Sequence, residues 1–336
     1  MTQFQSRPQL LNAKLTALWA VSESGLGGLL HAMKIPFSGL FLGSFAVIII
    51  TYLAFVNTNR FSAIIKATVL VVLIKAIVSP HSPPMAYVAV LFQGGLGALV
   101  YGGFGVNRVS AISFGALALF ESAFQKIFTL TIIFGMGLWD SIQQFFDGIQ
   151  NRLNAEWVSD LPWLFLAVYG LLYLIIGMFA GNLAIKLPEK VLENAKSIQP
   201  SQLILPSKEA TNKSKKRNKR IWLISGLLLF AVLVFLFSGS SNQALFIILR
   251  TFGAIVFFLF IFNPLFRYAM KKWVSRNKQN KKKDLDTIMS LMPDIRNNVG
   301  MAQHLSISEK NIWKRGTSFI MHWLSLSLYF SDDEEQ

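Results

Sequence analysis

The chain has 336 residues, of which 53% are hydrophobic and only 15% are charged, and its mean hydropathy is +0.48. An average soluble domain is about 25% charged, so this composition excludes a soluble globular enzyme and a disordered protein. The net charge is +15, and the absence of cysteine excludes disulfides, thiolate metal sites and thiol nucleophiles.

Eight apolar stretches are predicted to span a membrane, because a helix needs about 20 apolar residues to cross roughly 30 Å of hydrocarbon. In chain order they are residues 15–33, 39–55, 64–78, 85–104, 109–138, 161–185, 221–238 and 243–266. The third stretch is short, so we expect its helix to be tilted, shielded within a bundle or broken. The fifth is long, so we expect one end of it to project from the membrane.

The sequence therefore predicts an all-α polytopic membrane protein with about eight transmembrane helices. Residues 1–185 form a six-helix membrane domain, and 186–220 form a basic cytoplasmic linker with three prolines and a dense run of Lys and Arg. Residues 221–266 form a transmembrane helical hairpin. Residues 267–336 form a basic cytoplasmic tail with apolar residues at helical spacing, which indicates amphipathic helices.

Two basic blocks account for the charge of the chain. Residues 186–220 carry a local net charge of +7, and residues 267–315 carry +8. Basic blocks that flank apolar helices indicate cytoplasmic segments or contacts with anionic lipid, and they argue against nucleic-acid binding. We therefore expect a multi-pass protein of the cytoplasmic (inner) membrane with both termini in the cytoplasm.

Three ionisable residues inside the predicted spans are the most informative, because a charge at the bilayer centre costs a few kcal/mol unless it is paired or hydrated. At 1.5 Å per residue, Glu23, Lys75 and Glu121 lie about 12, 16 and 18 Å into spans that run in the same direction. We expect Lys75 to lie near Glu23, Glu121 or both. Two interpretations stay open: a buried ligand or ion site, or a structural ion pair that fixes helix register.

A polar stripe on the first span leads toward the outer surface. Trp19, Glu23, His31 and Lys34 are separated by multiples of a helical turn, so they share one face of the helix. The predicted ligand-binding residues are Glu23, Lys75, Glu121, Trp19, His31 and Lys34. The alternative for the outer end is an ordinary turn with a snorkelling lysine.

No sequence motif for catalysis or nucleotide binding is present, since H-E-x-x-H, G-x-S-x-G and the Gly-Lys-Ser/Thr phosphate loop are all missing. We therefore expect neither an enzyme nor a bound metal or cofactor, and any ATPase must be a separate protein. Residues 138–161 have apolar residues at helical spacing, which predicts an interfacial amphipathic helix that serves as an anchor or, less favoured, as a lid.

Six spans, cytoplasmic ends and small residues four apart at Ala13 and Ala17 resemble the substrate-capture (S) component of energy-coupling factor vitamin transporters, over roughly residues 10–185. The resemblance implies that Ala13 and Ala17 face a transmembrane coupling subunit. In the tail, Arg315 and Gly316 are similar to an element of the coupling subunit that contacts the ATPases. A fused coupling segment and a lipid-binding tail are equally compatible with this region.

The leading hypothesis is a transporter subunit that captures a small organic micronutrient from the outer side and is energised by a separate ATPase. Its expected partners are the small molecule, a coupling subunit with its ATPase, and anionic lipid at the basic segments. The alternative is a non-catalytic membrane scaffold or assembly factor whose basic C-terminal tail binds a cytoplasmic partner or anionic lipid.

Overall fold

The computed structural model describes residues 8–26, 38–79, 82, 84–198, 280–309 and 311–330, with isolated residues and one short helix between 249 and 272. These residues form ten α-helices, two π-helices and one 3-10 helix, and they contain no strand. The predicted all-α class is confirmed for the part of the chain that is described.

Five described helices are long and apolar enough to cross a membrane, so the chain is a multi-pass membrane protein by helix length and hydropathy. They are α3 (Ser38–Val56), α4 (Arg60–Val78), α5 (Pro84–Phe104), α6 (Arg108–Phe134) and α8 (Leu161–Ala184). These helices correspond to the second to sixth predicted spans. The seventh predicted span lies outside the described residues, and the eighth is described only in part, including the π-helix η4 (Phe257–Phe262).

Two predicted helix starts are too late. The first helix, α1 (Pro8–Val21), begins seven residues before the predicted start, and proline suits the first position of a helix. The third span was predicted to begin at residue 64, but α4 begins at Arg60, where the side chain of Asn59 accepts a hydrogen bond from the Ser62 amide at 3.3 Å. In both cases the helix includes polar residues that a search for apolar runs leaves out.

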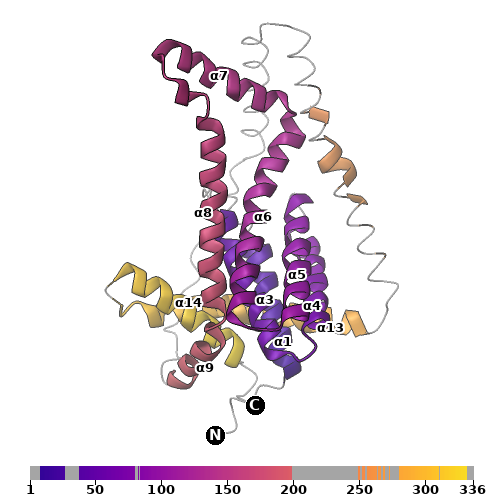
Figure 1. Cartoon of the computed structure of the whole chain (residues 1–336). Coiled ribbons are helices and arrows are strands. Elements are labelled where there is room, and N and C mark those ends of the chain that lie inside the picture. Colours follow the sequence, from indigo (N-terminus) through magenta and orange to yellow (C-terminus); the bar gives the residue numbers. More distant parts are fainter. Residues whose placement is uncertain are drawn as a thin grey trace, which may run out of the picture. The chain divides into compact units, whose positions relative to one another are not determined.

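Contacts divide the chain into two units, and most of the described helices belong to the first. This unit consists of Met1–Lys126, Trp163–Ile204 and Arg267–Gln336. Within it, α1 packs against α3 and α4, and α4 packs along α5 (Figure 1). Every residue of α1 from Lys14 to Val21 is buried, so α1 is enclosed rather than exposed to lipid.

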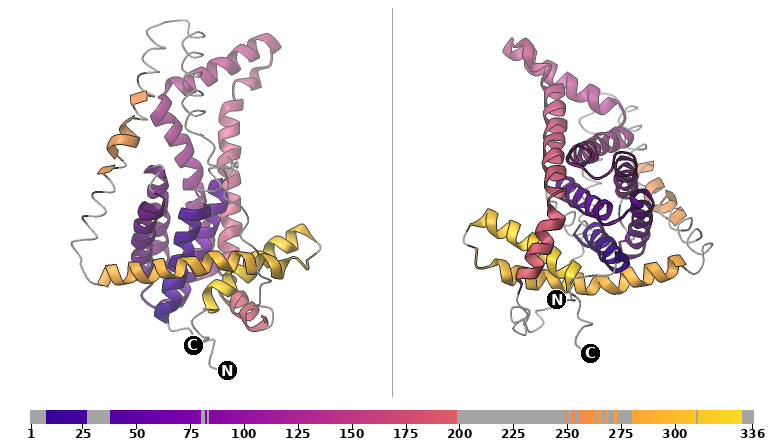
Figure 2. Two further views of the ribbon diagram at one scale, coloured as in Figure 1. Left: turned by 180° about the vertical axis from the view of Figure 1, so that it is seen from behind. Right: turned by 60° about the horizontal axis from the view of Figure 1, so that its bottom comes forward.

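The C-terminal tail is part of the first unit. Helix α13 (Asn280–Ser306) runs crosswise to α4 and α5 at the end of the bundle where α4 begins, and α14 (Ile312–Tyr329) returns against it (Figure 2). Four apolar residues of α13 are buried against the bundle: Leu285, Ile288, Met292 and Ile295. The predicted helical spacing in the tail is therefore confirmed, and it serves packing within the chain.

Hydrogen bonds fix the second half of α14, where residues 323–328 are all buried. The Trp323 indole donates to the Ile295 carbonyl at 2.9 Å, and Lys14 Nζ donates to the Phe330 carbonyl at 3.1 Å. Asn194, on the short helix α9 (Leu187–Ser197), donates to Ser325 Oγ at 2.9 Å. The first and last described segments therefore meet at the same end of the bundle, and the predicted cytoplasmic location of the two termini stays a prediction.

Helices α6 and α8 cross at unusually close range within the first unit. A Cβ on Gly177 would meet the backbone of Gly115, and one on Gly181 would meet the backbone of Ala111. Small residues four apart on both helices thus allow direct backbone contact, as is common in membranes. The sequence contains this pattern, with Ala111 and Gly115 on one helix and Gly177 and Gly181 on the other.

The second unit consists of Ile127–Pro162 and Leu205–Phe266, and its described part includes α7 (Gly137–Leu153) and the 3-10 helix η2 (Glu156–Val158). Helix α6 ends before Gly135, whose φ of +78° favours glycine. The Trp139 indole donates to Thr131 Oγ1 at 2.9 Å. A helix at the predicted interfacial segment is thus confirmed, while its role as an anchor or a lid stays a prediction.

Candidate functional site

The central feature of the first unit is a buried ion pair between Glu23 and Lys75. The Lys75 Nζ lies 2.7 Å from Glu23 Oε2, and the two side chains are only 5% and 7% exposed. Lys75 Nζ also donates to the Ala86 carbonyl at 3.1 Å and lies 6.0 Å from the centroid of the Tyr87 ring. The predicted proximity of Lys75 to Glu23 is therefore seen in the structure.

Each partner comes from a different helix with a local reason for its position. Lys75 lies in the last turn of α4, where the negative end of the helix dipole favours a cation. Glu23 lies in the π-helix η1 (Ser22–Leu26), which directly follows α1. Single π-turns are rare and often occur at functional sites, because they shift side chains out of the regular helical register.

Two serines beside Glu23 form hydrogen bonds with the backbone. Ser22 Oγ donates to the Trp19 carbonyl at 2.7 Å, and Ser24 Oγ donates to the Ala20 carbonyl at 2.6 Å. Serine and threonine hydroxyls often bond in this way to a carbonyl three or four residues earlier in a helix. Both hydroxyls next to the carboxylate are therefore satisfied within the chain.

The indole of Trp19 lies one helical turn before Glu23. Its side chain is fully buried, and its Nε1 has no hydrogen-bond partner among the described residues. A buried donor without a partner costs about 1–3 kcal/mol, so an acceptor from a bound molecule or water is expected there. The ion pair and this indole are therefore the buried polar groups from which a candidate site can be built.

Glu121 does not join the ion pair. Its Oε2 is buried without a hydrogen-bond partner among the described residues, and no ion pair links it to Lys75. Its neighbour Ser122 accepts a weak hydrogen bond of 3.4 Å from Gln93 Nε2, and the Oε1 of Gln93 also lacks a partner in the described part of the chain. Gln93 and Ser122 thus join α5 to α6, next in the sequence to the unpartnered Glu121.

The other predicted ligand-binding and partner-binding residues lie in different parts of the chain. His31 and Lys34 lie outside the described residues. Ala17 is fully buried within the chain, whereas Ala13 lines a cavity. Arg315 and Gly316 are exposed in the first half of α14. A partner helix would reach Ala17 only if helices of this chain moved away, so partner binding there stays a prediction from the resemblance.

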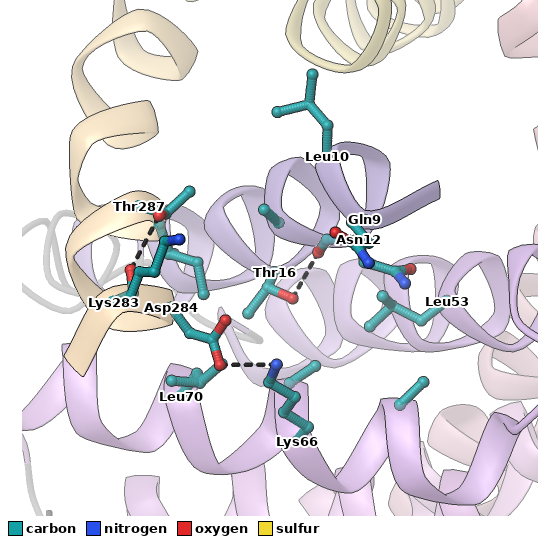
Figure 3. A pocket seen from close by; sticks show the side chains of 14 residues that line it. Gln9, Leu10, Asn12, Thr16, Leu53, Lys66, Leu70, Lys283, Asp284 and Thr287 are labelled. Carbon is teal, nitrogen blue, oxygen red and sulfur yellow. Dashed lines mark hydrogen bonds and ion pairs between the residues drawn. The ribbon is translucent and has the colours of Figure 1, made fainter. Parts of the chain in front are cut away.

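The cavity has a volume of about 820 Å³ and lies between α1, α3, α4 and α13. Figure 3 shows Lys66 of α4 and Asp284 of α13 pointing toward one another at its edge, with Nζ and Oδ2 2.7 Å apart. Asn12 and Thr16 of α1 line its inner wall. This second ion pair was missed, because Lys66 lies near the end of its span and Asp284 lies far away in the sequence, so both look like ordinary surface residues.

The described residues contain no cluster of three or more His, Asp or Glu side chains that could hold a metal ion. The chemistry of the site is therefore that of a cation, a carboxylate and an indole donor in a low-dielectric bundle. Groups of this kind can bind a small polar or zwitterionic molecule through charge and hydrogen bonds.

No family model, curated protein or solved structure matches this chain. The resemblance to the substrate-capture components of energy-coupling factor transporters therefore remains a prediction that rests on topology and on Ala13 and Ala17. What the structure establishes is a multi-pass helical membrane protein with a buried Glu23–Lys75 pair.

Proposed function

We propose that this protein is the small-molecule capture subunit of a membrane transporter, and that Glu23, Lys75 and Trp19 form its ligand site. The observation that supports this function is the Glu23–Lys75 pair, which is almost fully buried within a bundle of apolar helices. Ionisable residues inside membrane spans are costly and typically mark substrate or ion pathways.

The ligand class follows from the groups at the site. A carboxylate of the ligand would bind Lys75 Nζ, an amino group would bind Glu23, and a carbonyl or ring nitrogen would accept from the free Trp19 indole. The ring of Tyr87 beside Lys75 adds an apolar face. A small zwitterionic organic molecule, such as an amino-acid-like micronutrient, fits this set, and a separate ATPase would supply the energy.

The competing interpretation is that the pair only fixes α1 against α4. A buried ion pair is often neutral or unfavourable compared with apolar residues of the same volume, so stability alone is a weak reason to keep one. The π-turn at Glu23 and the free indole of Trp19 add two further local costs at the same place. Ligand binding explains all three features together, which favours the transport function.

The direct test is native mass spectrometry of the full chain, purified gently in detergent, to detect a small molecule bound in a one-to-one ratio. We expect such a molecule on the wild-type protein and its loss from the Glu23→Gln variant. The matched control is Glu189→Gln, which makes the same change at an exposed position on α9 and should retain the molecule. A wild-type protein without any small organic molecule would count against the capture function.

A second candidate function rests on the exposed half of α14. Lys314, Arg315 and Gly316 are exposed, while the other half of the same helix is buried in the bundle. This arrangement presents a fixed basic surface, which suits a scaffold that binds an acidic partner protein. Affinity purification with Arg315→Glu would then lose one reproducible partner, whereas a capture subunit with no tail partner would show the same proteins with and without the change.

A further inference from the structure

The cavity and the Glu23–Lys75 pair lie on the same polar face of α1. Gln9, Asn12, Thr16, Trp19 and Glu23 follow each other in steps of three and four residues, so they share one side of the helix. The first three line the cavity, and the last forms the ion pair. Trp19 stands between the cavity-lining residues and Glu23 in this series, and its side chain is fully buried.

Helix α4 also contributes residues both to the cavity and to the buried ion pair. Lys66, Ala67 and Leu70 line the cavity, and Lys75 follows five residues later, about 7.5 Å further along the axis. Two helices that meet the cavity therefore also carry the two partners of the buried ion pair. Along α4 the lysine side chains change from largely exposed at Lys66 to buried at Lys75, with apolar residues between them.

Helix α13 also lines the cavity, but unlike α1, α3 and α4 it runs across the end of the bundle (Figure 2). Its ionic link to α4 is the Lys66–Asp284 pair, whose side chains are 60% and 33% exposed. An exposed ion pair contributes little to stability, so this link opens far more easily than a buried one.

We propose that the cavity is an inner vestibule through which a small polar molecule leaves the Glu23–Lys75 site toward the end of the bundle where α1 begins. The Lys66–Asp284 pair acts as a latch that holds α13 over the vestibule, and Trp19 forms the barrier between vestibule and site. The side chains of Asn12 and Thr16 make this wall polar, with Asn12 paired to Asn57 and the Thr16 hydroxyl bonded to the Asn12 carbonyl. This inference rests on the proposed capture function.

The test uses the fact that the chain contains no cysteine, so a single introduced thiol can be labelled without background. Ala67→Cys and Ala13→Cys place a thiol on the vestibule wall, and Ala17→Cys places one at a fully buried control position. Arg315→Cys marks the side of the membrane on which the tail lies. The probe is a membrane-impermeant maleimide, added to sealed vesicles of either orientation.

We expect Ala67→Cys and Ala13→Cys to be labelled only from the side that labels Arg315→Cys, and Ala17→Cys to stay unlabelled. Adding Asp284→Lys replaces attraction by repulsion and should raise the labelling rate of Ala67→Cys by about threefold to tenfold. The charge-reversed pair Lys66→Asp with Asp284→Lys should return the rate to its original value.

Labelling of Ala67→Cys from the opposite side, or equal labelling of Ala17→Cys, would overturn the vestibule. A rate unchanged by Asp284→Lys would overturn the latch. These outcomes do not depend on whether a small molecule co-purifies, so failure of the capture function is seen separately in the mass spectrum. If a molecule is present, a polyethylene-glycol maleimide on Ala67→Cys should slow its dissociation, and an unchanged dissociation rate would refute the release route.

Discussion

Helix α4 carries two ion pairs of the same length in opposite surroundings. Lys75 pairs with Glu23 and Lys66 pairs with Asp284, both at 2.7 Å, but the first pair is buried and the second is largely exposed. The two lysines are about 14 Å apart along the helix at 1.5 Å per residue. Distance alone therefore says little about what an ion pair does, because burial decides whether breaking it is costly.

The two ion pairs of α4 therefore have different proposed roles. At the buried end, the pair holds charges that a ligand can compete for only from within the bundle. At the exposed end, the pair joins a crosswise helix to a span and opens at low cost. This contrast fits the two proposals, in which the buried pair lies at the ligand site and the exposed pair lies at the edge of the vestibule.

The largest expected effect comes from breaking each pair in turn by the same substitution. Lys75→Ala leaves the Glu23 carboxylate buried without its cation, which should lower the free energy of unfolding by about 3–5 kcal/mol. Lys66→Ala should lower it by less than about 1 kcal/mol, because both side chains reach solvent. Titration with a denaturing detergent measures both, and equal losses would mean that the burial difference does not govern their energetics.

A second pair of variants tests which carboxylate stabilises the buried charge of Lys75. Glu23→Gln leaves a buried ammonium group without its counter-ion, so it should cost several kcal/mol. Glu121→Gln keeps the shape of a side chain that forms no ion pair in the structure, so it should cost less than about 1 kcal/mol. If Glu121→Gln were as damaging as Glu23→Gln, Glu121 would share the charge of Lys75 and the site would be wider than described.

The smallest expected effect concerns α14, away from both pairs. His322 Nδ1 lies 3.2 Å from Asn194 Nδ2, and burial lowers the pKa of His322 below its ordinary value near 6.5. Below about pH 6.5 the unfolded chain binds a proton that the folded chain resists, so the free energy of unfolding falls as pH falls. Because the ring is only half-buried, we expect a loss of less than about 1 kcal/mol between about pH 7 and 5.

Replacing His322 with Gln should remove that part of the pH dependence while the two α4 ion pairs stay intact. Unfolding curves of wild type and variant at several pH values give the comparison. A wild-type curve that gains stability on acidification would contradict the assigned direction of the pKa shift.

The spans were predictable because apolar length in a membrane is a strong constraint on the chain. Five of the eight predicted spans are present as long helices. The similar depths of Lys75 and Glu23 in their spans correctly predicted that the two side chains lie close together. Glu121 has a similar depth, but its carboxylate forms no ion pair with Lys75. Depth gives the height of a residue in the membrane, whereas its direction around the helix axis depends on packing.

The tail could be predicted as helical but not as part of the bundle. Trp323 and Leu324 lie near basic residues, a pattern that also suits a membrane surface, yet both are buried against helices from distant parts of the chain. Lys14 departs from an apolar packing face, but its ammonium group reaches the Phe330 carbonyl. Such contacts join residues more than 300 positions apart, and no local pattern indicates them.

In the proposed function, the Glu23–Lys75 pair binds a ligand and is more than a structural link. The most direct measurement compares Glu23→Lys, Lys75→Glu and the double charge reversal for both unfolding free energy and retention of a co-purifying small molecule. We expect the double variant to regain much of the stability lost in the single variants, because an ion pair is restored, but not to retain the small molecule. Retention restored together with stability would contradict the claim, since the pair would then act only by holding α1 to α4.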